Sequence, residues 1–294
     1  MFFQVEGVQY VRERLELQDG DFLDLDWRIN SNNRKLVILS HGLEGNSGRH
    51  YIMRPAKFFF EQGYDILAWN CRGCSGEINR LPKTYQHGDV EDIGAVVDVA
   101  LSKGYENIFM IGFSMGGNMT LKYLGTKGDR LDKRLVAAAV FSVPCHLEDS
   151  SNEINKKGNR FYEKRFIRKL RAKLEVKAEK IPELAYDWSQ INNFHDFNLA
   201  YTLPVYGFQS EMEFLEQART DHLLPAVHVP TLLVNALNDP MLAGRNYPVD
   251  SAEEAKNVWL EMPNLGGHVG FTQVGQEFSY MEYRAKAFFA GKVE

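Results

Sequence analysis

The chain of 294 residues is poor in cysteine and has three, Cys71, Cys74 and Cys145. An odd, sparse set argues against a disulfide framework and for a reducing compartment. No window approaches the roughly 18 uncharged apolar residues that a membrane-spanning helix needs. The N-terminal sequence MFFQVEGVQYVRERLEL lacks a basic segment followed by a long apolar run, so we do not interpret it as a secretory signal. We therefore expect a cytoplasmic protein.

Positive charge is not in excess either. The chain has 34 lysines and arginines against 39 aspartates and glutamates, for a net charge of −5. This balance gives no reason to expect nucleic acid as a partner. Hydrophobic residues make up 44% and charged residues 25%, as is usual for a soluble globular protein. A chain of this length can form one large domain or a core with a sizeable insertion.

Short apolar runs recur along the chain, with helical patterns between them. Two alternating segments, 10–17 and 21–27, are predicted as leading antiparallel strands. Continuous apolar runs, typical of strands buried on both faces, follow at 35–40, 65–70, 107–113, 136–143, 231–236 and 258–262. Helices are predicted at 54–62, 90–102, 115–125 and 276–290. This alternation predicts an α/β fold with a mostly parallel, doubly wound sheet.

Residues 146–228 break this rhythm because they contain no good buried strand. Within them Tyr162, Phe166, Leu170 and Leu174 recur every four residues, which predicts an amphipathic helix. A second helix is expected in the sequence SEMEFLEQART. We therefore expect a core formed by residues 1–145 and 229–294, with a helical cap inserted at 146–228.

The sequence Gly112-Phe113-Ser114-Met115-Gly116 is a G-x-S-x-G motif. It follows a predicted buried strand and opens a predicted helix, the context in which this motif exposes a nucleophilic serine on a tight turn. A serine that only caps a helix is the alternative, and the flanking context favours the nucleophile. We predict that Ser114 is the nucleophile.

A serine hydroxyl needs a base to attack at neutral pH. In folds of this type the order along the chain is serine, acid, histidine. Asp239 and His268 follow two of the later predicted strands, at the sheet edge where open α/β sheets bind ligands. We predict His268 as general base and then acid, and Asp239 as the carboxylate that orients it. Glu148 and Asp149 are rival acids, several residues beyond the end of an earlier strand.

An oxyanion hole is expected in the loop SHGLEGNSG at 40–48, which follows a predicted strand. The backbone N–H groups of Leu43 and Met115 are its expected donors. We interpret His41 as a residue that holds this loop by hydrogen bonds rather than as a catalytic group. Glu44 is likewise interpreted as a hydrogen-bonded structural carboxylate rather than an acid catalyst.

Several longer segments carry a resemblance to a known family. They are HGLEGNSGRHY, NCRGCSGEINRLPKTYQHGDVEDI, GFSMGGN, NALNDP, GGHVGF and, in the predicted cap, FHDFNLAYTLPVYGF. Together they resemble the YheT-like branch of the α/β-hydrolase superfamily, which includes animal abhydrolase-domain phospholipases and yeast medium-chain ester-forming acyltransferases. The resemblance implies a serine, aspartate and histidine triad, and these fall on Ser114, Asp239 and His268. Asn238 departs from the family pattern, which often has an aspartate there.

Two weaker signals remain. Cys71-x-x-Cys74 would suit a redox or zinc site, but no second ligand pair has zinc spacing, so we interpret it as a tight loop and expect no metal. Residues 156–180 hold eleven lysines and arginines against three glutamates, which we interpret as a solvated helix face. Contact with an anionic membrane surface, or with substrates that carry phosphate head groups, is the second interpretation of this run.

We therefore expect an α/β-hydrolase that cleaves small-molecule carboxylic esters of short to medium acyl chain through an acyl-enzyme, without metal or organic cofactor. Capture of the acyl-enzyme by an alcohol would make it an acyltransferase, and lipid esters are alternative substrates. A peptidase or amidase would need an acidic amine-binding site in the cap, which the sequence does not reveal. A binding protein on this scaffold would usually lack a triad member. Serine at position 114 also disfavours dehalogenase and epoxide hydrolase chemistry, which uses aspartate in this fold.

Overall fold

The computed structural model describes residues 5–30 and 33–292. The first four residues of the segment considered above as a secretory signal lie outside this range. None of the helices in the described part of the chain combines the length and apolar composition needed to cross a membrane.

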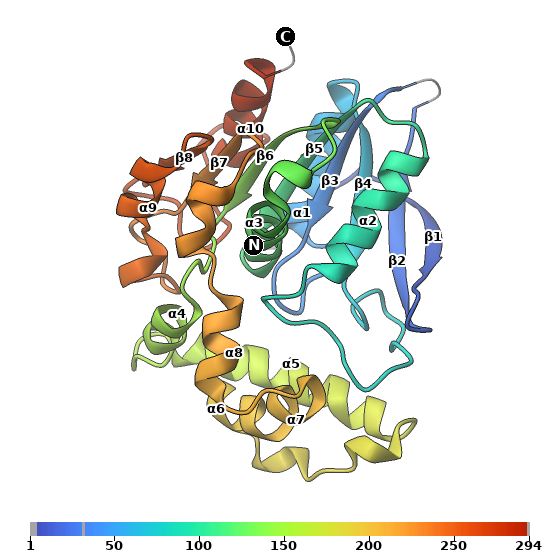
Figure 1. Ribbon diagram of the computed structural model, residues 1–294, viewed down its shortest axis with the longest axis vertical. Helices are drawn as coiled ribbons and strands as arrows, with labels where there is room; N and C mark the ends of the chain where they lie inside the picture. The colour runs from blue at the N-terminus through green and yellow to red at the C-terminus, as the bar shows by residue number, and fades with distance from the viewer. Residues whose placement is uncertain (1–4, 31–32, 293–294) are drawn as a thin grey trace.

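The described residues form an eight-stranded sheet with the order β1-β2-β4-β3-β5-β6-β7-β8 (Figure 1). The strands are β1 (Val11–Glu16), β2 (Phe22–Arg28), β3 (Lys35–Ser40), β4 (Asp65–Asn70), β5 (Asn107–Phe113), β6 (Leu135–Phe141), β7 (Thr231–Val234) and β8 (Val258–Glu261). β1 pairs antiparallel with β2, and β2 with β4, whereas the other neighbours are parallel. The predicted mostly parallel sheet with two leading antiparallel strands is therefore confirmed.

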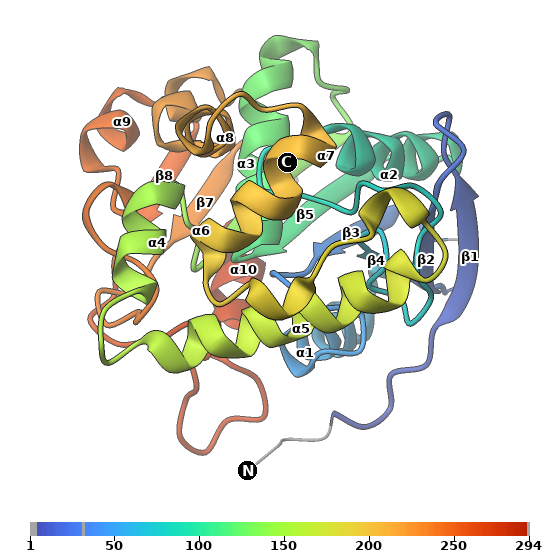
Figure 2. The same cartoon turned by 90° about the horizontal axis from the view of Figure 1, so that it is seen from below.

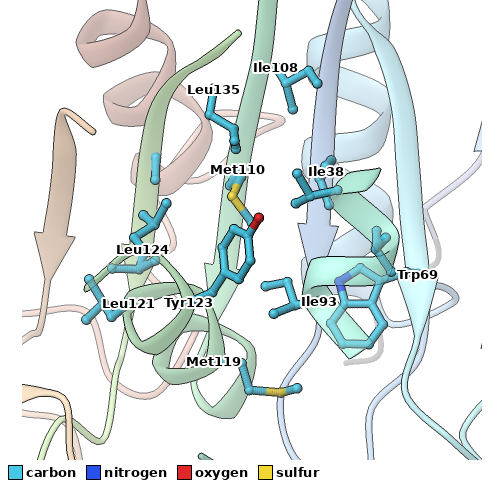
Figure 3. Packing of buried hydrophobic residues seen from close by; sticks show 14 of the residues in the cluster. Ile38, Trp69, Ile93, Ile108, Met110, Met119, Leu121, Tyr123, Leu124 and Leu135 are labelled. Carbon is cyan, nitrogen blue, oxygen red and sulfur yellow. The ribbon is translucent and has the colours of Figure 1, made fainter. Parts of the chain in front are cut away.

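Helices cover both faces of the sheet. α1 (His50–Glu61) and α10 (Tyr280–Ala290) pack on one face, and α2 (Glu91–Ser102) and α3 (Met115–Lys127) on the other; α9 (Val249–Glu254) lies beside β8. Successive strand residues point to opposite faces, so Ile38 and Met110 join the core under α2 and α3 (Figure 3), while Val37 and Phe109 join the core under α1 and α10. Burial on both faces explains why the strands are continuous apolar runs.

The starts of two helices differ from the predictions by four residues. α1 begins at His50 rather than at residue 54, with Pro55 inside the helix. Proline is usually confined to the first turn, so the pattern favoured a later start. α10 begins at Tyr280 rather than at residue 276, because Ser279 and Glu282 form a capping box: Ser279 N–H donates to the Glu282 carboxylate at 2.8 Å, and Ser279 Oγ accepts from Met281 N–H at 3.3 Å.

The segment between β6 and β7 is helical, and its described residues form no strand. Its helices are α4 (Leu147–Ile154), α5 (Arg160–Ala178), α6 (Phe194–Phe197), α7 (Leu203–Tyr206) and α8 (Glu211–Ala218), with short 3-10 and π segments between and after them. They lie together at one end of the sheet (Figures 1 and 2). The insertion has its own apolar cluster, which includes Ile167, Leu174, Trp188 and Tyr201.

Helix α5 differs in detail from the prediction. Its buried residues are Glu163, Ile167, Leu170, Leu174 and Lys177. These are spaced alternately by four and three residues, which keeps them on one face; a strict spacing of four, as predicted from Tyr162 onward, drifts around the helix. The interpretation of the basic run as a solvated face is wrong at Lys173 and Lys177, whose side chains are buried.

Candidate active site

Ser114 lies on a strained turn between β5 and α3. Its φ of 53° and ψ of −122° are rare for a residue with a side chain. The turn needs glycine on both sides: a Cβ on Gly112 would lie 2.6 Å from the carbonyl oxygen of Gly116, and one on Gly116 would lie 2.4 Å from the carbonyl oxygen of His41. Ser114 N–H donates to the carbonyl of Phe141 at 2.9 Å, which fixes the turn against β6. This is the geometry expected of the G-x-S-x-G motif.

The structure brings Ser114, His268 and Asp239 together from three separate segments. His268 Nε2 lies 3.0 Å from Ser114 Oγ. His268 Nδ1 lies 2.9 Å from Asp239 Oδ2 and 3.1 Å from Oδ1. The Asp239 side chain is fully buried and that of His268 is 13% exposed, so the carboxylate interacts with the imidazole away from water. A carboxylate on Nδ1 leaves Nε2 free to accept the serine proton.

The loops on either side of this group are held by backbone hydrogen bonds. Asp239 Oδ1 accepts from Met241 N–H at 2.9 Å. Asn238 Oδ1 accepts from the N–H groups of Gly266 and Gly267, each at 2.9 Å, and so joins the loop of the acid to the loop of His268. An amide oxygen can do this as well as a carboxylate, so the departure from the family pattern at Asn238 preserves the connection.

The rival acids lie elsewhere. Asp149 Oδ1 lies 2.7 Å from Arg245 Nη2, and Glu148 Oε2 lies 3.3 Å from the same nitrogen. His146 Nδ1 accepts from Asp149 N–H as the cap of α4. These contacts assign both carboxylates to a structural ion pair.

The loop after β3 lies directly against the nucleophile. A Cβ on Gly42 would lie 3.1 Å from Cβ of Ser114. His41 Nε2 accepts from Cys71 N–H at 3.1 Å and Nδ1 donates to the carbonyl of Gly42 at 2.7 Å. Burial lowers the pKa of His41 to about 4, so the ring is neutral. The interpretation of His41 as a loop-holding residue is confirmed.

Glu44 is confirmed as a hydrogen-bonded structural carboxylate. It accepts from the hydroxyl of Tyr85 and from Nζ of Lys173 on α5. Sequence reasoning missed Lys173 as its partner, although lysines 169, 173 and 177 recur every four residues and so share one side of the helix.

Cys71 and Cys74 also lie as interpreted. Cys74 N–H donates to the carbonyl of Cys71 at 2.9 Å, which closes a tight turn. Both thiols are buried, and burial raises the pKa of each. A high pKa disfavours the thiolate that redox chemistry and zinc binding require.

A pocket opens at Ser114 and His268, between the sheet and the helical insertion. Its volume is about 920 Å³, the open mouth included. Most of its wall is apolar and comes from the insertion: Leu147, Ile154, Phe166, Leu170, Phe194, Phe197, Phe214 and Leu215. Leu43 and Met115, the predicted oxyanion donors, line it beside the serine. None of the described residues that line it is an aspartate, glutamate, lysine or arginine.

Comparison with known proteins finds relatives named as hydrolases. Residues 31–247 match the Hydrolase_4 family, described as serine aminopeptidase, S33. YheT of Escherichia coli, whose name marks it as a candidate esterase, is 28% identical over 88% of this chain and 78% of its own. Phospholipase ABHD3 of Mus musculus is 29% identical over 98% of this chain and 73% of its own.

Among solved structures, esterase Pf2001 of Pyrococcus furiosus superposes with a TM-score of 0.65 at 20% identity, covering 97% of this chain and 92% of that one. This likeness concerns the fold, which is that of the α/β-hydrolases. The resemblance to YheT-like hydrolases predicted from the motifs is confirmed. Since the family match spans most of its length, the chain belongs to the Hydrolase_4 family of α/β-hydrolases.

Proposed function

We propose that the protein is a serine hydrolase that cleaves carboxylic esters through an acyl-enzyme on Ser114. The observation that carries the proposal is the contact of His268 with both Ser114 Oγ and the Asp239 carboxylate, in the lining of a largely apolar pocket. The names of the relatives, an esterase and a phospholipase, support ester substrates.

In the proposed reaction Ser114 Oγ attacks the ester carbonyl carbon while His268 Nε2 takes the serine proton. The N–H groups of Leu43 and Met115 stabilise the negative oxygen of the tetrahedral intermediate. The intermediate collapses as His268 donates its proton to the departing alcohol, leaving an acyl-serine. Water then attacks the acyl carbon, with His268 again as base, and the acid is released. Asp239 stabilises the imidazolium that forms in each half of the reaction.

The helical insertion acts in this proposal as a cap over a core of residues 1–145 and 229–294. The pocket wall that it supplies is apolar and carries no charge among its described residues, which suits an uncharged acyl chain. In this proposal the acyl chain is short to medium in length, and the substrate is a small-molecule acyl ester.

Two other activities use the same serine. An alcohol that reaches the acyl-enzyme ahead of water would make the protein an acyltransferase, and a lipid ester would make it a lipase. The family description also raises an aminopeptidase, which must bind the substrate's ammonium group. The described residues of the pocket offer no carboxylate for that role, so this composition favours esters.

The test is hydrolysis of p-nitrophenyl esters from acetate to palmitate by the wild type, Ser114→Ala and Ser102→Ala. Ser102 lies at the exposed end of α2 and is the matched control. We expect Ser114→Ala to lose at least about 10³-fold in kcat and Ser102→Ala to match the wild type. Product analysis with added alcohol separates transfer from hydrolysis. A Ser114→Ala variant as active as the wild type would disprove the proposal.

A further inference from the structure

Residues 42–45 form a closed turn beside Ser114. A hydrogen bond of 2.9 Å from Gly45 N–H to the carbonyl of Gly42 closes it, with Leu43 and Glu44 as its central residues. Glu44 has a φ of 54°, a left-handed conformation that is uncommon for a residue with a side chain. Such a conformation persists only where the surroundings hold it. The contacts of Glu44 therefore help to hold the shape of the turn that contains Leu43.

Helix α5 of the insertion supplies two of those contacts, and Arg49 and Tyr85 of the core supply others. Lys173 Nζ donates to Glu44 Oε1 at 2.5 Å, and the two side chains are only 9% and 8% exposed. Lys169 Nζ donates to the Glu44 carbonyl oxygen at 3.3 Å, and Arg49 donates to the same oxygen at 3.2 Å. The hydroxyl of Tyr85 donates to the Glu44 carboxylate as well. In a buried pair of this kind, removal of one charge leaves the other without compensation.

Apolar contacts also join the turn to the insertion. The side chain of Leu43 packs against the apolar cluster of the insertion, which includes Ile167, Leu170 and Leu174 of α5, and also against the core of the sheet. In Figure 2 α5 runs from α4 toward β2 across the end of the sheet. The insertion thus contacts the turn through lysines of α5 and through the apolar cluster to which α5 contributes.

We propose that Lys173 and Glu44 are a positioning pair that holds the Leu43 N–H where the oxyanion forms. This inference rests on the proposed function. Neither residue lines the pocket, so the pair acts through the loop rather than on the substrate. Because α5 also lines the pocket with Phe166 and Leu170, the same helix determines how the acyl chain is held and how well the oxyanion is stabilised.

The experiment compares Lys173→Met, Glu44→Gln and the double variant with Lys164→Met, the matched control at an exposed position of α5. We expect Lys173→Met to lower kcat by about 10- to 100-fold with KM changed less than about twofold, because an oxyanion donor acts in the transition state. The affinity for an alkyl boronic acid, which forms a tetrahedral adduct with serine, should fall in parallel. In the double variant the second substitution should add little to the first.

Hydrogen exchange of the backbone amides at 41–48, measured on the intact chain, gives a readout that needs no turnover. We expect exchange there to rise at least about tenfold in Lys173→Met and to stay unchanged in Lys164→Met. If Lys173→Met does not fold, the same exchange and kcat measurements are made on Glu44→Gln, which keeps the shape of the side chain and removes its charge. Unchanged exchange, unchanged kcat, or a rise in KM alone would each overturn the positioning role. Inactivity of the wild type on every ester would instead count against the proposed function, and the exchange measurement would still decide the role of the pair.

Discussion

Asp239 contacts Nδ1 of His268 with both of its carboxylate oxygens, at 2.9 and 3.1 Å, from a fully buried position. The contact fixes the hydrogen of the imidazole on Nδ1. Replacing Asp239 by asparagine would put an amide N–H in reach of that nitrogen and favour the tautomer with its hydrogen on Nε2, which cannot accept the serine proton.

We therefore expect Asp239→Asn to lower kcat by about 10⁴-fold with little change in KM. Steady-state kinetics on the best ester of the chain-length panel measures it. Asp149→Asn is the matched control, because Asp149 pairs with Arg245, and it should stay within about threefold of the wild type. A large loss at Asp149 with little loss at Asp239 would reverse the assignment of the acid.

The bridge from Asn238 to Gly266 and Gly267 gives a second prediction. Asn238→Ala removes two hydrogen bonds, each worth about 1 kcal/mol, and loosens the loop that carries His268. We expect kcat to fall about tenfold. Asn238→Asp keeps an oxygen that accepts from both N–H groups and should retain most of the activity. An equal fall in kcat in the two variants would show that the hydrogen bonds from Gly266 and Gly267 to residue 238 do not support activity.

Acid should destabilise the fold through histidines whose pKa is lowered in the folded protein, above all the buried His41. Burial lowers the pKa of His41 to about 4, whereas an imidazole in the unfolded chain titrates near about 6.5. Between these values the unfolded state binds more protons, so the free energy of unfolding falls as the pH falls, by up to about 1.4 kcal/mol per pH unit. Burial lowers the pKa of His87 to about 4 as well, which adds to the effect.

Urea denaturation at several pH values between 7 and 4.5 measures this dependence. His41→Gln removes the titrating group and should give a flatter decline than the wild type over the same interval. Its absolute stability at pH 7 will be lower, since the bridge between Cys71 and Gly42 is weakened, but only the slope tests the prediction. An identical slope in the two proteins would contradict it.

Chain-length preference should depend on Phe166, which lines the pocket from α5. Phe166→Ala removes apolar contact, so kcat/KM for the preferred ester should fall about tenfold and the optimum should move toward longer chains. Phe161→Ala is the matched control on the same helix, because Phe161 is 69% exposed. The ester panel measures both variants, and an unmoved optimum in Phe166→Ala would place the acyl chain elsewhere.

The fold could largely be predicted from the sequence because its signals are local. A strand buried on both faces must be apolar throughout, and the run at 107–113 coincides with β5 for that reason. The residues of the candidate site follow strand ends and glycine-rich turns, which local sequence also marks. The true start of α10 could have been predicted from the S-x-x-E pattern at Ser279 and Glu282.

The contacts that could not be predicted join distant parts of the chain. Glu44 and Lys173 are 129 residues apart in the sequence. The sequence pattern of a basic run does not distinguish a lysine exposed to water from one that pairs with a buried carboxylate. Lys177 likewise donates to Asn79 Oδ1 at 2.6 Å from a fully buried position. Which core residue each lysine contacts depends on how the insertion packs against the sheet. No periodic sequence pattern reports that packing.

The helical insertion leaves the sheet after β6 and returns at β7, two strands that are direct neighbours, with Phe141 opposite Val234. Evolution can therefore lengthen, shorten or replace it without disturbing the order of the strands. Lys173 on α5 limits that freedom, because a replacement insertion without this lysine would leave the Glu44 carboxylate buried without the ammonium group that it pairs with. On the proposals above, one insertion supplies both the wall of the substrate pocket and the support of the oxyanion loop, so a designer who exchanges the insertion for another should transplant Lys173 with it.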